Sequence, residues 1–463
     1  MKQMKRRDFI KGVVAASAGA ATPFNILKAG EAPNSKLNLV GIGIGSQGSG
    51  DLSHLATSHN IIGIADADPE GRHRKCIASY DNLQGIKTWT DYRKMFDDIG
   101  DDIDGVYTAT PDHARFAVSM FVLGHGIPLY AQKPLCHTVK EVRLLTEESR
   151  RRNVATQMGH QYHTQKEYTQ KARDWVLDGA VGKVREVNVY CRKNYPTIRA
   201  PLSGSKPPKG LDWNLWLNRA EEIPFSESYM GREWIRYSHF SGLVGDMGSH
   251  LLDPAWNALG LEAPISVRAD DVVPSSLSDG DVYGVALPKA GVVTWEFGAR
   301  GDMPPVTMRY FLGQGIEFAR PKHLEKNRDE EAETVMGSGL VITGEDASIL
   351  IPHGGVASII PEKVAQETPD PPRKTPRPRA GNHLDNWAMA IKGEDEVSSP
   401  FDYSGPLSEA VVLGDIALTQ PGATLKWDSK NLRFSNNDQA NRSLFLERVN
   451  PRDGMDWYYT GRK

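Results

Sequence analysis

The chain has little cysteine, no long apolar run and almost no net charge. Its 463 residues include three scattered cysteines, Cys76, Cys136 and Cys191, which excludes a disulfide framework and predicts buried thiols. No stretch has the roughly 20 apolar residues of a transmembrane helix, so we expect no membrane span. The net charge of −3, from 55 basic and 58 acidic residues, argues against nucleic acid or an anionic membrane as a partner.

The first twenty residues have the layout of an export signal. A basic head contains Lys2, Lys5, Arg6 and Arg7, and a run rich in Ala, Gly and Val follows it. The adjacent arginines resemble a twin-arginine signal in particular. We therefore expect residues 1–30 to be a removable signal and linker, read by the twin-arginine export machinery, and the mature protein to be periplasmic. A basic, disordered N-terminus is the alternative.

Two patterns of strand divide the rest of the chain. Up to about residue 157, short apolar strands alternate with helical stretches, a pattern typical of a parallel α/β sheet. Later strands are longer and alternate apolar with polar residues, which favours a mixed or antiparallel sheet with one covered face. We predict an α/β domain over residues 31–157. An α+β domain with a large, mostly antiparallel open sheet, for substrate binding and oligomerisation, should follow over residues 158–463.

A glycine-rich turn follows the first strand. Residues 43–48 read G-x-G-x-x-G, and the turn opens a helix, so its backbone N–H groups and the helix dipole can hold a pyrophosphate. Asp66 ends the second strand, where a carboxylate accepts bonds from a ribose and repels a 2′-phosphate. The pattern predicts a Rossmann domain that binds NAD rather than NADP, although Arg72 and Arg74 weaken that preference. The candidate cofactor residues are Gly43, Gly45, Ser46, Gln47, Gly48, Asp66, Thr110, Pro111, His113, Gln132 and Lys133.

Two further stretches carry the candidate chemistry. Lys133-Pro134 ends a strand, and ligands of open α/β sheets lie beyond the carboxyl ends of the strands. Asp246 and His250 are four residues apart, so on a helix they share a face. A histidine with a nearby carboxylate can take a hydroxyl proton while hydride leaves the same carbon. The same spacing suits two metal ligands, but a third has no clear candidate, so we predict no metal. A surface turn and a helix cap are the structural alternatives.

Together these motifs resemble the glucose-fructose oxidoreductase / inositol dehydrogenase (Gfo/Idh/MocA) family over roughly residues 36–260. The resemblance also includes GAVGKVREV and G-x-x-x-D-x-G-x-H, and it implies that Lys133, Asp246 and His250 line the site where a sugar meets nicotinamide. The family usually has Glu before Lys-Pro, whereas this chain has Gln132. The lost negative charge should lower the pKa of Lys133.

Aromatic and polar side chains between the two motifs suit a sugar, whose C–H faces stack on rings and whose hydroxyls bond to polar tips. For any single tryptophan, core packing is the alternative. The candidate substrate residues are His160, Tyr162, His163, Tyr195, Trp234 and Arg236.

An exported enzyme has no free supply of nicotinamide cofactor, so NAD should stay bound and its hydride should be returned. We therefore expect an exported, NAD-dependent oxidoreductase that acts on a sugar or glycoside and forms homo-oligomers. His250 would accept the proton, Asp246 would orient His250, and Lys133 would polarise the oxygen. One alternative is a redox-neutral glycoside hydrolase or lyase, with Tyr162, His163 or Asp253 as an extra acid or base. A non-catalytic sugar- or nucleotide-binding protein and a plain cytoplasmic dehydrogenase are the others.

Overall fold

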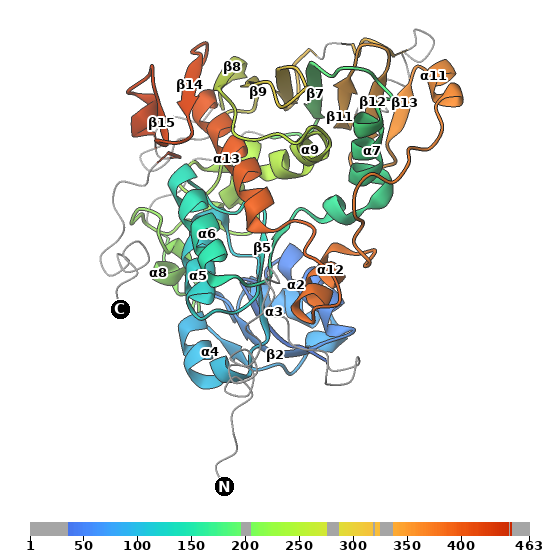
Figure 1. Cartoon of the computed structure of the whole chain (residues 1–463). Helices are drawn as coiled ribbons and strands as arrows, with labels where there is room; N and C mark the ends of the chain where they lie inside the picture. The colour runs from blue at the N-terminus through green and yellow to red at the C-terminus, as the bar shows by residue number, and fades with distance from the viewer. Residues whose placement is uncertain are drawn as a thin grey trace.

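A computed structural model describes residues 36–195, 205–275, 287–317, 320–324, 337–443 and 445–446. The predicted signal at residues 1–30 lies outside them. Figure 1 shows two sheets, one near each end of the molecule, with helices between them. Cys136 and Cys191 are buried free thiols, as predicted, whereas Cys76 is only half-buried. Among the helices described, none is long and apolar enough to cross a membrane.

The first sheet is wholly parallel, and its strand order is β3-β2-β1-β4-β5-β6. This is the order of a dinucleotide-binding Rossmann domain, as predicted. The strands are β1 (Asn38–Ile42), β2 (Asn60–Ala65), β3 (Thr88–Trp89), β4 (Gly105–Thr108), β5 (Leu129–Gln132) and β6 (Thr156–Gly159). The helices are α2 (Gln47–Ala56), α3 (Arg72–Ala78), α4 (Tyr92–Ile99), α5 (Asp112–Gly124) and α6 (Val139–Arg152). The domain boundary predicted after residue 157 falls inside β6, which ends at Gly159.

The second sheet has nine strands in the order β13-β12-β11-β7-β10-β9-β8-β14-β15, and only β7 and β10 pair in parallel. This mostly antiparallel α+β domain confirms the predicted class. Its strands are β7 (Glu186–Cys191), β8 (Ser266–Val273), β9 (Ala290–Phe297), β10 (Val306–Leu312), β11 (Ser338–Thr343), β12 (Ser348–Pro352), β13 (Ser358–Ile360), β14 (Leu425–Asp428) and β15 (Arg433–Phe434). Its helices are α7 (Lys171–Asp178), α8 (Trp213–Leu217), α9 (Leu243–Leu259), α11 (Glu362–Glu367), α12 (His383–Ile391) and α13 (Phe401–Leu418).

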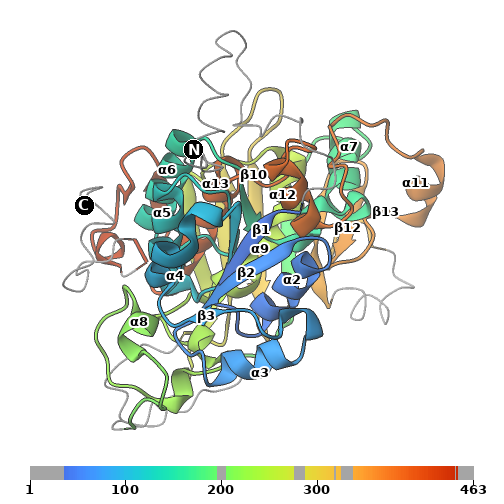
Figure 2. The same ribbon diagram turned by 90° about the horizontal axis from the view of Figure 1, so that it is seen from below.

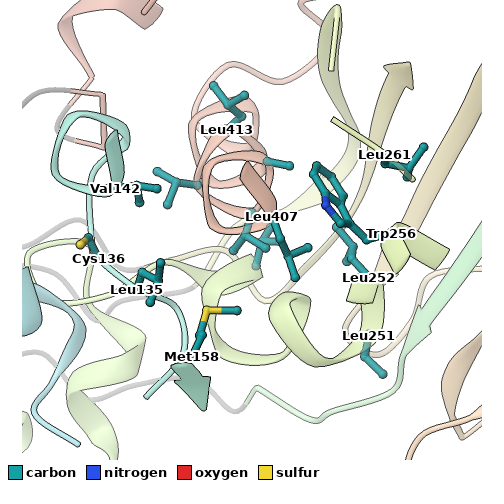
Figure 3. Packing of buried hydrophobic residues seen from close by; sticks show 14 of the residues in the cluster. Leu135, Cys136, Val142, Met158, Leu251, Leu252, Trp256, Leu261, Leu407 and Leu413 are labelled. Atoms are coloured by element: carbon teal, nitrogen blue, oxygen red, sulfur yellow. The ribbon is translucent and has the colours of Figure 1, made fainter. Parts of the chain in front are cut away.

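A continuous apolar core joins the two domains. Leu407 and Leu413 of α13 lie between Val142 of α6 on one side and Leu252 and Trp256 of α9 on the other (Figure 3). Helix α13 also holds the start of α9, because the Asp415 carboxylate accepts a 2.7 Å bond from the backbone N–H of Val244. The packing sets the position of α9, and hence of Asp246 and His250, relative to the first sheet.

One helix of the C-terminal half completes the first domain. Trp387 of α12 is fully buried in a cluster with Leu39, Tyr107 and Tyr130, beside α2 (Figures 1 and 2). The ring of Tyr130 meets Trp387 edge-on at 5.8 Å. Helix α12 therefore belongs to the core of the Rossmann domain, although it follows most strands of the second sheet in the sequence.

Replacing Trp387 by Ala should lower the free energy of unfolding by about 3–5 kcal/mol, because it removes a fully buried aromatic side chain and leaves a cavity. Urea denaturation followed by fluorescence and circular dichroism measures the loss. Ile265→Ala is the control: Ile265 is 57 % exposed, so its loss should stay within about 0.5 kcal/mol. Equal losses in the two variants would contradict the assignment of α12 to the first core.

Candidate active site

One cavity runs from the glycine turn to the second domain. Its walls come from the carboxyl ends of β1, β2, β4 and β5, from the start of α9, and from the segment that contains α8. The predicted residues that line it are Gly43, Gly45, Ser46, Gln47, Asp66, Thr110, Pro111, Gln132, Lys133, Trp234, Asp246 and His250.

The glycine turn is tightly built. Gly43 has φ +68°, and a Cβ there would lie 2.5 Å from the Thr110 methyl group. A Cβ at Gly48 would lie 2.9 Å from the Gly43 carbonyl oxygen. Asp66 closes the turn, because one oxygen accepts a 3.0 Å bond from the N–H of Ile44 and the other a 3.0 Å bond from the N–H of Asp68. Only glycine allows this backbone to pack so closely.

Lys133 and Asp246 meet across the domain boundary. The Lys133–Pro134 peptide bond is cis. The Lys133 ammonium donates to the backbone oxygen of Asp246 and lies 3.9 Å from its carboxylate. Burial lowers the pKa of Lys133, while Asp246 and Asp112 oppose that shift. The ammonium is thus held at the first turn of α9, beside the cavity.

Asp246 does not orient His250, which corrects the sequence-based expectation. Its carboxylate accepts bonds from Lys193 and, at 3.1 Å, from the hydroxyl of Tyr195. Burial raises the pKa of Asp246, but Lys133 and Lys193 outweigh it and leave the pKa below its usual value. The helical spacing places Asp246 and His250 on one face, but two lysines compete for the carboxylate. Lys193 follows β7 and belongs to no motif, so the sequence offered no signal for it.

His250 is a neutral imidazole at the cavity wall. Burial lowers its pKa well below the usual value, and the positive charge of Lys133 adds to the shift. Its buried Nδ1 has no hydrogen-bond partner within the described part of the chain. The ring of His353, from the loop after β12, lies 5.7 Å away, and that of Tyr162 lies 6.4 Å away. His353 was missed, because it is far from every motif in the sequence.

Gln132 does not face Lys133. Its amide nitrogen donates to the Asp51 carboxylate at 2.7 Å, and its side chain lies against Gly159. The pKa of Lys133 is lowered, as expected, but its causes are burial and nearby charges rather than the amide. Glutamine at position 132, where the family usually has glutamate, therefore leaves the Lys133–Asp246 contact intact.

His160 and His163 belong to a different cluster, which corrects their expected contact with substrate. The Asp253 carboxylate lies 3.1 Å from Nε2 of His160 and 2.9 Å from Nδ1 of His163, and it accepts a 2.6 Å bond from Tyr403. The cluster is buried and does not line the cavity. The atoms of this cluster that could bind a metal ion, from His160, His163 and Asp253, lie within 4.8 Å of one another. The hydrogen bonds among these side chains already explain that spacing.

Three further expectations need correction. His113 is buried, with Nε2 2.9 Å from the Trp216 carbonyl oxygen and its ring packed against Phe240, so it lies behind the cavity wall. Tyr195 is also behind the wall, because its hydroxyl bonds to Asp246. Arg236 packs its guanidinium 5.0 Å from the Tyr195 ring and does not line the cavity. These three residues are close in sequence to residues that line the cavity, but their own side chains point into the protein.

Buried neutral histidines make stability depend on pH. Burial lowers the pKa of His160, His250 and His383 below 6.5. A lowered pKa means that the unfolded state binds more protons, so stability is present above pH 6.5 and is lost as the pH falls below it. We expect urea denaturation to show lower stability at pH 5.5 than at pH 7.5. His383→Asn should show a smaller loss on acidification, and an unchanged loss would contradict the assignment.

Residues 36–160 match the model of the oxidoreductase family with an NAD-binding Rossmann fold, GFO_IDH_MocA. The rhizopine catabolism protein MocA of Rhizobium meliloti is 27 % identical over 190 residues, which are 40 % of this chain and 58 % of that protein. Glucose-6-phosphate 3-dehydrogenase of Bacillus subtilis is 20 % identical over 217 residues, 46 % of this chain and 51 % of that enzyme. The chain thus spans about half the length of the curated relatives it matches.

Solved structures extend the likeness to the whole fold. The WlbA dehydrogenase from Bordetella pertussis, in complex with NADH and UDP-GlcNAcA, has a TM-score of 0.55 at 15 % identity, over 85 % of this chain and 99 % of that one. An NAD-binding protein from Listeria innocua has a TM-score of 0.53 at 16 % identity, over 85 % of this chain and 97 % of that one. At these identities the likeness establishes a shared architecture.

Proposed function

We propose that this chain is an NAD-dependent oxidoreductase of the Gfo/Idh/MocA type that acts on a hydroxyl of a sugar or glycoside. One observation carries the proposal: Lys133, from the first domain, and neutral His250, from the second, line the same cavity as the glycine turn. The curated and solved relatives named for sugar metabolism support the substrate class.

The residues of the cavity fit a dinucleotide. The glycine turn leaves no room for a side chain at Gly43 or Gly48, and its backbone N–H groups open helix α2, where a pyrophosphate would be held. Asp66 supports NAD over NADP, since a carboxylate at the end of β2 repels a 2′-phosphate. When bound, nicotinamide would supply the acceptor and donor of hydride.

The protein's own groups would handle the proton and the oxygen. His250, kept neutral by burial, can accept the proton of the substrate hydroxyl. The Lys133 ammonium can donate a hydrogen bond to the same oxygen and stabilise negative charge as it develops. Asp246 would hold Lys133 in place rather than orient the imidazole.

Residues 205–241 favour slow release of a cofactor. The segment bonds to the first domain at several points. The N–H of Asp212 donates to the Ala67 carbonyl at 2.9 Å, the Trp216 carbonyl contacts His113, and the Arg219 guanidinium pairs with Glu141 at 3.1 Å. Its apolar cluster includes Tyr229 and Phe240. In Figures 1 and 2 helix α8 lies beside the Rossmann domain, and residues of this segment form one wall of the cavity. A retained NAD would have its hydride returned in a closed cycle.

Export is a proposal from sequence alone. The twin arginines Arg6 and Arg7 support transfer of the folded protein through the twin-arginine machinery and a periplasmic location. Retained NAD is consistent with that route. A homo-oligomer formed through the second domain is a further proposal.

The alternative is a redox-neutral glycoside hydrolase or lyase on the same site. Oxidation at one carbon acidifies the neighbouring C–H group, so a second base could remove that proton and an acid could protonate the leaving aglycone. Of the expected extra groups, His163 and Asp253 are bonded to each other, but Tyr162 lies beside His250. His353, with its ring 4.8 Å from that of Tyr162, is a second candidate.

Lys133→Ala and His250→Ala should each reduce kcat/KM by at least about 10², because each removes a group that handles the reacting oxygen or its proton. The assay follows keto-sugar formation with a panel of sugars and glycosides. His125→Gln is a matched control, since His125 is exposed and its ring Nδ1 lies 2.8 Å from the backbone oxygen of Phe121 in its own helix turn. Full activity in both alanine variants would overturn the proposed site.

Purified protein should release about one equivalent of NAD on denaturation, and Trp216→Ala should lose NAD faster during dialysis, because the variant weakens the wall formed by residues 205–241. Chromatography of the released nucleotide measures both.

Release of nitrophenol from glycosides without net NADH would favour the hydrolase, whereas accumulation of keto-sugar would favour the oxidoreductase. Protein that never contains NAD would contradict the retained cofactor.

A further inference from the structure

A buried carboxylate lies behind the cavity wall and takes no part in the mechanism above. Asp51, on the second turn of α2, is 6 % exposed and does not line the cavity. Its Oδ2 accepts bonds from the hydroxyl of Tyr107 at 2.8 Å and from the amide of Gln132 at 2.7 Å. Its Oδ1 accepts from the amide of Gln47 at 2.8 Å, and both oxygens lie 3.1 Å from the amide of Gln161. The Asp51 carboxylate thus accepts hydrogen bonds from four side chains.

The three glutamines come from separate parts of the Rossmann domain. Gln47 opens α2 at the glycine turn, Gln132 ends β5 next to Lys133, and Gln161 follows β6. All three line the cavity. Each turns its amide nitrogen to Asp51, so the amide carbonyl oxygen of each is directed away from that carboxylate.

The side chains that bond to Asp51 suit an ionised carboxylate, and none of them is a cation. Burial raises its pKa, and the bonds from Tyr107, Gln47, Gln132 and Gln161 oppose that shift. Every hydrogen bond donor to this carboxylate in the described part of the chain is neutral. A protonated acid would have to donate one bond itself, so one of these side chains would have to turn an acceptor toward it. The observed arrangement, in which all four side chains donate, is that of a negative charge surrounded by neutral dipoles.

We propose that Asp51 is a positioning residue that fixes the amide orientation of the three glutamines and makes the site prefer the oxidised, positively charged nicotinamide. Asp51 lies directly behind three glutamines that line the cavity, so its negative charge acts on the cavity through them. A cationic ring gains from that field and a neutral reduced ring does not. This inference rests on the proposed function, because it requires a bound nicotinamide.

The same contact explains why residue 132 is an amide. A glutamate there would place two carboxylates about 2.7 Å apart, and like charges at that separation share one proton. The site therefore holds one acid and one amide at positions 51 and 132. Exchanging them in Asp51→Asn/Gln132→Glu keeps both the charge and the hydrogen bond.

The test is a reductive titration of the protein-bound cofactor, followed at 340 nm against a reference dye. Asp51→Asn should weaken the preference for the oxidised form about tenfold, which raises the two-electron midpoint potential by about 30 mV. The exchange variant Asp51→Asn/Gln132→Glu should return the potential toward the wild-type value. Asp97→Asn, at an exposed position, is the control and should leave it unchanged.

A cofactor-independent measurement accompanies the titration. Relative to the wild type, Gln132→Glu alone should lose more melting temperature at pH 8 than at pH 5, because the paired acids must share a proton, and the exchange variant should not show this difference. An unchanged potential in Asp51→Asn, with or without a lower melting temperature, would overturn the inference and leave the proposed function intact. Protein that binds neither NAD nor NADH would overturn both, whereas a shifted potential without sugar oxidation would contradict only the proposed function.

Discussion

The contact between Lys133 and the first turn of α9 is the interaction on which the candidate site depends. It joins the end of β5 to a helix of the other domain, and it places an ammonium group next to a carboxylate and a neutral imidazole. A buried ammonium is stable only with such partners, because burial alone removes it from water. The position of α9 is therefore a condition for the chemistry. The packing of α13 against α6 and α9 meets that condition.

Buried carboxylates near the cavity differ in their partners, as Asp246, Asp253 and Asp51 show. Asp246 is paired with lysines and supports a positive charge at the substrate end. Asp253 is shared by two histidines and a tyrosine, and it ties the segment after β6 to α9 and α13. Asp51 has neutral donors alone within the described part of the chain and lies behind glutamines that line the cavity. Residue type alone would assign all three to acid–base catalysis, but only their partners separate a charge support, a structural tie and a positioning group.

The fold and the site answer different questions about function. The architecture is shared with structures that bind NAD or NADH, at identities of 15–16 %. Such a likeness establishes the architecture alone and says nothing of which hydroxyl is oxidised. The features that bear on reaction type belong to this chain: neutral His250, the nearby His353 and Tyr162, and the wall formed by residues 205–241. If the cofactor is retained as proposed, a second titratable group beside the first would suit a cycle that returns its hydride.

The sequence by itself determined the glycine turn, the parallel sheet, the mostly antiparallel second sheet and the convergence of Lys133, Asp246 and His250 on one cavity. These follow from local rules: glycine spacing, strand periodicity, and the position of residues at strand ends or on one helix face. Only the tertiary structure decided that Asp246 binds Lys193, that Gln132 binds Asp51, that His160 and His163 face Asp253, and that α12 belongs to the first core. The physical reason is that a buried polar group takes the nearest partner in space, and those partners come from segments up to hundreds of residues away.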